Sequence, residues 1–389
     1  MSQGKEEKST SARGGWIRFD RNEWAGSFGD LGTDLPLIAA MIPAASLDAA
    51  SVFVLFGAAQ LLTGFLYGLP MPMQPLKAMA VLVITQKLSA GVLHGAGLAI
   101  GCVMLVLTLS GLLNWLARVI PLCVIRGVQM GLGLQLANLA MKSYLPGDGA
   151  PGYVLALVSF AIGVALMGSR RFPAALAIIA LGMVYAMVMD IDVGVVAGGI
   201  GLAAPVLHVP TWADLATGFI ALTLPQLPLS LSNSVFATDR TLRDLFPDRH
   251  VGLRKIGLTY SVVNMVVPFF GGIPMCHGCG GLAGHYAFGA RTGGSVVIYG
   301  SMFVVIGLLF GKVADHVVRI FPQPVLGVIL LFEALTLLLF VRDTAHDRRG
   351  FMIALLVAVA ALSLPQGFII GLLGGTLLYY LPERFSLGR

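Results

Sequence analysis

Two short stretches of the sequence, residues 70–78 and 271–281, place proline, glycine and a few polar side chains within otherwise apolar surroundings. The residues in them that could contact a ligand are Gln74, Pro75, Lys77, Cys276, His277, Gly278 and Cys279. Proline is tolerated in the first turn of a helix, and glycine lets a ligand approach the backbone closely. Two opposed helix N-termini and the Lys77 ammonium would offer a desolvated oxyanion several donors and a full positive charge. The chemistry that these stretches suit is the binding of an anion.

Each of these residues also has a simpler interpretation. Lys77 could be a structural lysine that reaches the membrane surface, and the glycines could serve close helix packing. We favour the functional interpretation, because a charge inside an apolar segment is costly and usually functional. His277 could contact the ligand, relay a proton or simply be packed. The two cysteines around it lack the second ligand pair of a zinc site, so we expect no metal and no other cofactor.

Two further apolar segments carry polar residues at helical spacing. Asp30 and Asp34 lie four residues apart, so they share one face of any helix that contains both. A carboxylate in a membrane span can carry a coupling proton or help to bind sodium, whereas its simpler role is to cap a broken helix. Gln226 and Asn233 could orient the substrate or only link helices. Glu333 is a third acid in an apolar segment, and we favour a structural role for it.

These residues must be positioned by membrane-spanning helices, because the composition excludes a water-soluble protein. Of 389 residues, 57% are hydrophobic and 11% are charged, against roughly 25% charged residues in soluble domains. Apolar runs predict fourteen segments, near 27–46, 51–69, 74–88, 92–116, 120–141, 152–168, 173–190, 213–238, 253–270, 278–290, 293–311, 317–341, 350–363 and 366–381. The third and tenth are too short to cross a hydrocarbon core of roughly 30 Å. We expect them to be half-helices whose first N–H groups lack partners.

The distribution of basic residues supports this count of segments. With the N-terminus inside, nineteen Lys and Arg residues fall on the cytoplasmic side and four on the other. The net charge of +6 therefore reflects topology and not binding to nucleic acid. Arg126 lies near the inner end of its segment, where it could reach lipid head groups. The first 25 or so residues lack a signal peptide, and we expect both termini to be cytoplasmic, in the inner membrane of a bacterium.

Three short matches between the two halves indicate an internal repeat. The matched pairs are 34–37 with 226–229, 72–73 with 274–275, and 120–121 with 321–322. Their separations of 192, 202 and 201 residues leave seven segments in each half, and an odd number gives the halves opposite orientations. Chance coincidence of prolines is the alternative. Secondary transporters with inverted repeats build their sites from interrupted helices at the membrane midplane.

Four blocks of the sequence resemble a molybdate transporter of the sulfate-permease-related family. The blocks are 22–36 (NEWAGSFGDLGTDLP), 72–78 (PMQPLKA), 224–229 (LPQLPL) with Asn233, and 274–277 (PMCH) followed by 289–293 (GARTG). They lie in both halves, so the resemblance covers nearly the whole chain. It implies the all-α fold shared with sulfate permeases and the uracil transporter. That fold has seven plus seven inverted spans and holds the substrate between the third and tenth segments.

The resemblance also implies a division into domains. Segments at 27–116 and 213–311 would form the core domain, and 117–212 and 312–381 the gate domain, between a cytoplasmic segment at 1–26 and a short tail at 382–389. Because only about eight residues follow the last segment, we expect the C-terminal regulatory domain of many sulfate permeases to be absent.

We therefore expect a secondary active importer of a tetrahedral oxyanion, molybdate before sulfate, in which the core moves against the gate. Its expected partners are the oxyanion, a coupling cation (a proton rather than sodium) and the lipid bilayer, and a homodimer is one option. The chain lacks the nucleotide-binding pattern GxxxxGK[ST], so it does not drive transport with ATP on its own. Molybdate, tungstate and sulfate are all tetrahedral dianions, and the residues do not separate them.

Three other functions stay open at this point. A nucleobase carrier of the same architecture would be expected to place carboxylates in the eighth and tenth segments, where this chain has Gln226, Cys276, His277 and Cys279. An anion channel would give uptake that follows voltage without a driving ion. A membrane enzyme could use the Cys276 and Cys279 thiols, although we expect no enzyme.

Overall fold

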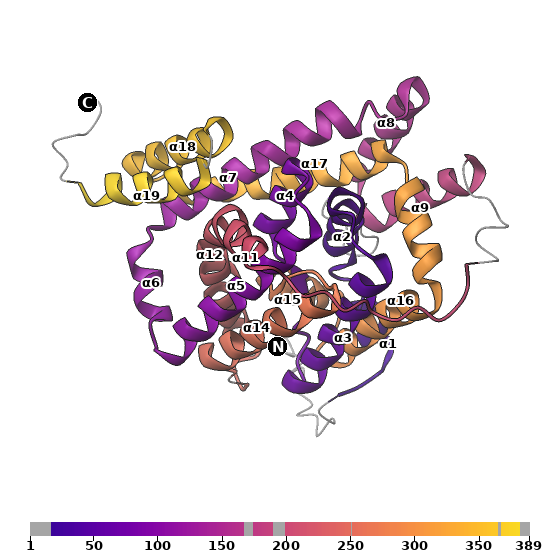
Figure 1. Ribbon diagram of the computed structural model, residues 1–389, viewed down its shortest axis with the longest axis horizontal. Helices are drawn as coiled ribbons and strands as arrows, with labels where there is room; N and C mark the ends of the chain where they lie inside the picture. Colours follow the sequence, from indigo (N-terminus) through magenta and orange to yellow (C-terminus); the bar gives the residue numbers. More distant parts are fainter. Residues whose placement is uncertain (1–16, 167–173, 190–198, 250, 365–366, 382–389) are drawn as a thin grey trace, which may run out of the picture.

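The computed structural model describes residues 17–166, 174–189, 199–249, 251–364 and 367–381, which are almost entirely helical (Figure 1). The first half contains α1 (Arg21–Gly26), α2 (Leu31–Ala45), α3 (Ala49–Tyr67), β1 (Met73–Pro75), α4 (Lys77–Gln86), α5 (Ala90–Leu109), α6 (Leu113–Val119), α7 (Leu122–Leu139), η1 (Ala140–Tyr144), α8 (Gly149–Ala165) and α9 (Ala174–Met189). The tail at 382–389, and most of the segment at 1–26, lie outside the described residues.

The second half also places one short strand before a short helix. It contains α11 (Trp212–Gly218), η2 (Phe219–Thr223), α12 (Leu224–Leu229), η3 (Ser230–Ala237), α13 (Thr238–Leu245), α14 (Leu253–Val266), η4 (Val267–Phe270), β2 (Met275–His277), α15 (Cys279–Ala287), α16 (Gly294–Ile320), α17 (Gln323–Leu339), η5 (Phe340–Thr344), α18 (Arg348–Ser363) and α19 (Gly367–Tyr380). A helix overlaps each of the fourteen apolar ranges predicted from the sequence.

Several helices have the length and composition of membrane spans. Among the described residues, six helical stretches are long and apolar enough to cross a membrane: Ala49–Tyr67, Ala90–Leu109, Leu122–Tyr144, Trp212–Leu245, Gly294–Ala314 and Gln323–Thr344. Shorter apolar helices lie at Leu31–Ala45, Lys77–Gln86, Gly149–Ala165, Ala177–Val188 and Gly367–Tyr380. The chain is therefore a helical protein with several helices suited to a bilayer.

Several predicted boundaries differ from the structure, and a glycine lies at two of them. The helix predicted to run to residue 116 ends at Leu109, because Gly111 adopts a φ of +75° and a separate helix, α6, follows. The helix predicted to end at 311 continues as α16 to Ile320, with only a kink at Phe310. Gly311 does not break it but allows close packing, since a Cβ there would lie 2.6 Å from the Cβ of Ala50.

The helices form two groups that pack mainly within themselves. In one group α3 packs against α16, and α5 packs against α14 and α11; these helices occupy the lower part of Figure 1. In the other, α7 packs against α17, α18 and α19, in the upper part of the view. Helix α4 contacts α7 from the second group and α2, which packs against α16 of the first group. Helix α4, which begins with Lys77, therefore lies at the junction of the two groups.

Two three-residue strands cross at this junction. β1 and β2 pair in antiparallel register, with Gln74 opposite Cys276 and Met73 opposite His277. Helices α4 and α15 each begin two residues after a strand and contain 10 and 9 residues. At about 1.5 Å per residue, each is roughly 15 Å long, half of a hydrocarbon core. The strand pair thus places the N-termini of both short helices near one point.

Each strand is held by an amide side chain of a neighbouring helix. Gln60 of α3 donates from Nε2 to the carbonyl oxygen of Met73 at 2.6 Å and accepts from the N–H of Met73 at 2.8 Å. Asn264 of α14 makes the same two bonds with Met275, at 2.6 and 2.9 Å. Buried backbone groups without partners cost about 1–3 kcal/mol each. The two amide clamps, Gln60 and Asn264, therefore fix both strands by the same means.

Candidate functional site

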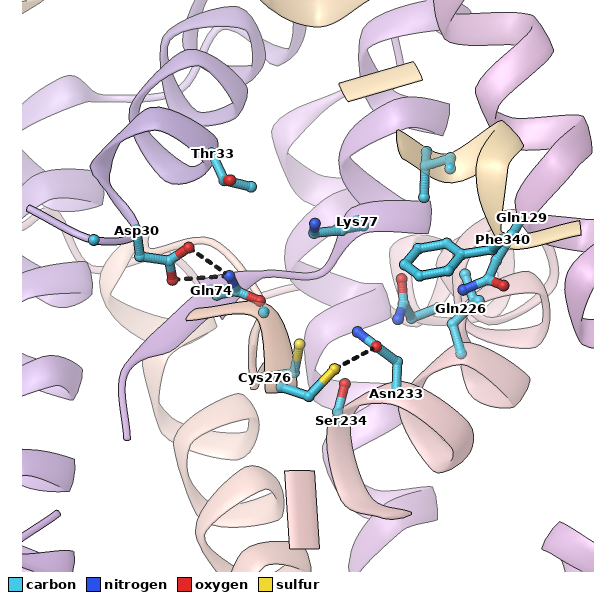
Figure 2. A pocket seen from close by; sticks show the side chains of 15 residues that line it. Asp30, Thr33, Gln74, Lys77, Gln129, Gln226, Asn233, Ser234, Cys276 and Phe340 are labelled. Atoms are coloured by element: carbon cyan, nitrogen blue, oxygen red, sulfur yellow. Dashed lines mark hydrogen bonds between the residues drawn. The ribbon is translucent and has the colours of Figure 1, made fainter. Parts of the chain in front are cut away.

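A cavity of about 230 Å³ lies where the strands and the two short helices meet (Figure 2). The residues that line it are Gly29, Asp30, Thr33, Gln74, Lys77, Gln129, Gln226, Leu229, Asn233, Ser234, Cys276, Cys279, Gly280, Leu337 and Phe340. Its volume is several times the ~30 Å³ that one water molecule occupies in the liquid. The cavity therefore has room for a small polyatomic ion with some of its water.

Most of the residues predicted to bind substrate meet in this cavity. It brings together Gln74, Lys77, Gln226, Asn233, Cys276 and Cys279, and also Asp30 from the predicted coupling pair. Pro75, His277, Gly278 and Asp34 do not line it. The strands explain part of this division, because successive side chains of a strand point to opposite faces. Gln74 and Cys276 are cross-strand partners that face the cavity, and their sequence neighbours face away.

His277 is packed behind the strands and does not contribute to the cavity. It is fully buried, and its ring lies edge-on to the ring of Tyr67 with the centroids 5.2 Å apart. Its Nε2 lies 3.4 Å from the Tyr67 hydroxyl, and its Nδ1 lies 3.4 Å from the carbonyl oxygen of Pro72. This position agrees with the packed role, and the other two roles of His277 stay predictions.

Gln74 links strand β1 to the start of helix α2. Its Nε2 donates to both carboxylate oxygens of Asp30, at 2.7 and 2.8 Å (Figure 2). Gly278 makes room for this side chain, because a Cβ at Gly278 would lie 1.6 Å from Gln74 Oε1. A Cβ at Gly281 would likewise meet Asp30 Oδ2 at 2.2 Å. The role of Gly278 is therefore to accommodate the Asp30–Gln74 pair.

The two aspartates of α2 have different surroundings. Asp30 is the N-cap residue of α2, but its side chain makes no capping bond and turns to Gln74. Asp34 is fully buried one turn later, where its Oδ2 accepts a hydrogen bond from the Tyr299 hydroxyl at 3.0 Å and its Oδ1 has no hydrogen-bond partner. Neither carboxylate caps the helix. The side chain of Glu333 lies outside the described residues.

The N-terminus of α4 is closed by a side chain, contrary to the prediction that both ends present free N–H groups. Gln226 Oε1 accepts from the backbone N–H groups of Ala78 at 2.9 Å and Met79 at 3.2 Å. The reason is that α12 packs against α4 and carries Gln226 to this end. Lys77, the first residue of α4, directs its side chain into the cavity (Figure 2).

The N-terminus of α15 is open to the cavity. Gly278 precedes it and has no side chain with which to cap the first turn, while Cys279 and Gly280 line the cavity. Within the described part of the chain, no side chain takes the place here that Gln226 takes at α4. Cys279 instead donates from Sγ to Asn233 Oδ1 at 3.1 Å. The partial positive charge of this helix end therefore faces the cavity directly.

Several lining residues were missed from the sequence. Thr33 follows Asp30 by three residues, so helical spacing within the recognised block could have identified it, whereas Ser234 is the direct neighbour of Asn233, a spacing that does not predict a shared helix face. Asn233 and Ser234 lie in η3, a π-helical stretch, which is a type often found at functional sites. Gln129 lies three residues after Arg126. The apolar side chains of Leu337 and Phe340 carry no sequence signal.

Arg126 stands at the edge of the cavity, and its predicted reach to the lipid head groups stays a prediction. It forms an ion pair with Asp343, and its guanidinium lies 5.0 Å from the centre of the Phe340 ring. Its Nη1 also donates to Gln129 Oε1 at 2.9 Å. Phe340 and Gln129 both line the cavity. A second positive charge is therefore held next to the site by α7 and η5.

The site as a whole has the chemistry of an anion receptor. It combines Lys77, the α15 N-terminus, amide N–H groups and hydroxyls around a partly enclosed space, with the Asp30 carboxylate held by Gln74 at its side. Among the described residues, no group of three or more His, Cys, Asp or Glu side chains is arranged to hold a metal ion. All four cysteines are free thiols.

Comparison of the sequence with known proteins identifies close relatives. The chain matches the family described as the molybdate transporter of the MFS superfamily over residues 22–136 and 218–337. It is 33% identical to molybdate transporter 1 of Arabidopsis thaliana, over 94% of this chain and 88% of the relative. It is 30% identical to molybdate transporter 2 of the same plant, over 90% and 86%. For molybdate transporter 1 of Chlamydomonas reinhardtii the identity is 29%, over 93% and 92%.

Comparison of the fold with solved structures finds proteins of the same architecture. The transmembrane domain of the cyanobacterial bicarbonate transporter BicA matches with a TM-score of 0.67 and 18% identity, over 94% of this chain and 98% of that domain. SLC26A9 matches with a TM-score of 0.69 and 13% identity, over 92% of this chain and 65% of SLC26A9. At these identities the likeness shows the fold alone, which is the sulfate-permease fold predicted from the sequence.

Proposed function

The chain belongs to the family of molybdate transporters, and from this premise we propose that it imports molybdate or a related tetrahedral oxyanion such as sulfate. Its relatives are transporters and not enzymes. We propose further that the transport is secondary active and that the oxyanion binds in the cavity between α4 and α15.

The observation that carries this proposal is the position of one lysine between two short helices. Lys77 and the open end of α15 line the same cavity, so a full charge and a helix dipole act on the same guest. Gln74, Asn233 and Ser234 add polar groups that can orient oxygen atoms. Hydrogen bonds between such donors and a charged oxygen are roughly twice as strong as bonds between neutral groups.

We propose that the fourteen helical segments are spans or half-spans of an inverted repeat. Matched contacts in the two halves support this: α3 packs on α16 as α14 packs on α5, and Gln60 holds β1 as Asn264 holds β2. The core would comprise 27–116 and 213–311, and the gate 117–212 and 312–381. The kink of α16 at Phe310 lies next to this boundary. Transport would occur by movement of the core against the gate.

Import of a dianion requires a coupled cation. Moving two negative charges into a negative interior costs roughly 4.6 kcal/mol at 100 mV, at about 2.3 kcal/mol per charge. Two protons would cancel this cost, and Asp30 and Asp34 are buried carboxylates beside or near the cavity. We propose a proton, rather than sodium, as the coupling ion and these residues as its carriers.

We also propose that both termini face the cytoplasm, because the basic residues favour that orientation. The relatives from Arabidopsis thaliana and Chlamydomonas reinhardtii are eukaryotic. They lend no support to the bacterial inner membrane predicted from the sequence. A homodimer stays a prediction.

Uptake of radiolabelled molybdate into proteoliposomes, with competing anions and an imposed pH gradient, tests the proposal. We expect uptake that an inward proton gradient stimulates and that unlabelled molybdate suppresses more strongly than sulfate. Equal suppression by sulfate would make sulfate the substrate. Uptake that follows voltage and ignores the proton gradient would identify a channel.

A further inference from the structure

We propose that Gln226 acts as an internal ligand of the α4 N-terminus, which the oxyanion must displace to occupy that end of the cavity. The inference rests on the proposed function of the cavity, and it reverses the role expected of a polar residue in a binding site. Instead of attracting the substrate, the Gln226 amide competes with it.

The contacts of Gln226 are those of a bound ligand. Its Oε1 accepts from two successive N–H groups in the first turn of α4, those of Ala78 at 2.9 Å and Met79 at 3.2 Å. These N–H groups are the ones that a helix N-terminus offers to an anion. The side chain is 2% exposed and lines the cavity, so its oxygen occupies a place that an oxyanion in the cavity can reach.

A second set of contacts holds the amide in this place. Gln226 Nε2 donates to Ser230 Oγ at 3.1 Å, and Ser230 Oγ lies 2.8 Å from the hydroxyl of Tyr260. Ser230 and Tyr260 are fully buried and do not line the cavity. The chain Gln226–Ser230–Tyr260 therefore connects the α4 N-terminus to η3 and α14.

The irregular backbone around α12 allows Gln226 to move away from the α4 N-terminus. Gln226 lies in α12, which has only six residues between the π-helical stretches η2 and η3 and contains Pro228. Proline removes one helical hydrogen bond, and π-helical stretches are irregular turns often found at functional sites. A small shift of α12 would withdraw the amide without disturbing α4.

Charge decides which ligand the α4 N-terminus prefers. The amide oxygen is neutral, whereas an oxyanion carries charge and gains from the helix dipole and from Lys77. Water and neutral solutes lack this advantage and leave Gln226 in place. Displacement therefore selects for anions, and it moves α12 when, and only when, the substrate has bound.

Three variants separate this role from that of an ordinary substrate ligand. Molybdate binding to the purified full chain in detergent is measured by isothermal titration calorimetry. Q226A removes the competitor, so we expect the Kd to fall about tenfold, equivalent to ~1.4 kcal/mol. S230A loosens the amide without touching the cavity and should lower the Kd about threefold. Q226E supplies a tethered carboxylate and should raise the Kd at least tenfold. Q135A, on α7 away from the cavity, is the matched control and should bind like the wild type.

A Kd that rises or stays constant in both Q226A and S230A overturns the proposal while leaving the anion site intact. If Q226A does not fold, the opposite shifts expected for S230A and Q226E still decide the matter. Failure of the proposed function looks different, since the wild type and every variant would then bind no molybdate.

Discussion

The N-termini of α4 and α15 both follow a short strand, but they differ in the side chains that surround them. Each follows a three-residue strand, and each strand is held by one amide side chain. The α4 end has the Lys77 charge and is closed by Gln226. The α15 end has no charged side chain in its first turn, which reads Cys279, Gly280 and Gly281, and it is open.

The difference shows how two similarly built helix ends can divide one task. Lys77 gives the α4 end a long-range attraction for anions, and the Gln226 amide keeps that end from holding one too tightly or too early. The glycines of α15 let an ion approach the backbone at short range. The structure predicts that an arriving ion contacts the α15 end and Lys77 first and replaces Gln226 afterwards.

Removal of the Lys77 charge should have the largest effect. Hydrogen bonds to charged groups contribute about 1.5–3 kcal/mol, so K77A should reduce molybdate uptake at subsaturating substrate by about 100-fold. Lys77→Arg should retain part of the activity because it keeps the charge. Uptake assays in proteoliposomes at several substrate concentrations measure both.

Lys87 provides the control for this comparison. It is an exposed lysine at the opposite end of the same helix, and K87A should transport like the wild type. Equal loss in K77A and K87A would mean that helix stability, not the charge at the N-terminus, sets the activity.

Glycine substitutions probe the α15 end. G278A would place a methyl group on the Gln74 amide and break the Asp30–Gln74 pair, so we expect uptake to fall by about 30-fold. At Gly280 a Cβ meets no atom within 4 Å, and G280A should cost less than about threefold. A G280A variant with lower uptake than G278A would show that space in the cavity matters more than the position of Gln74.

The amide clamps Gln60 and Asn264 allow a test of whether β1 and β2 are held in the same way. Q60L and N264L each leave two buried backbone groups of one strand without partners, at a cost of about 2–6 kcal/mol. We expect similar decreases in the thermal unfolding midpoint of the purified protein for both. A large decrease in only one variant would indicate that the strands are supported by different means.

The cysteines should matter least. Cys276 and Cys279 line the cavity through their thiols, and serine has a similar size and also donates a hydrogen bond. The double variant C276S/C279S should keep molybdate uptake within about threefold of the wild type. Loss of nearly all uptake in that variant would revive a chemical role for the thiols.

Much of this arrangement could be predicted from the sequence because its signals are local. Apolar runs located the helices, and Pro, Gly and Lys within short runs located both short helices and the lining residues Gln74, Lys77, Cys276 and Cys279. Where the prediction failed, the decisive contacts join distant residues. Gln226 lies 148 positions from Ala78 in the sequence. No residue near Ala78 in the sequence indicates that the Ala78 N–H group has a hydrogen-bond partner.

His277 illustrates the other limit. Strand periodicity places alternate residues on opposite faces, but the sequence alone does not say which face meets the cavity. The pairing of Gln74 with Cys276 decides this, and it sends His277 to Tyr67. The sequence did not predict the amide clamps for a related reason. An amide inside an apolar helix has many possible partners, and the partner of Gln60 is Met73, 13 residues away.

The most direct test of the central claim is the position of the bound ion. Tungstate shares the shape and charge of molybdate, and its heavy atom can be located by anomalous diffraction from crystals of the protein. We predict one strong peak in the cavity, within hydrogen-bonding reach of Lys77 Nζ and the first N–H groups of α15, with the Gln226 amide withdrawn from α4. A peak outside this cavity, in protein that transports tungstate, would contradict the account.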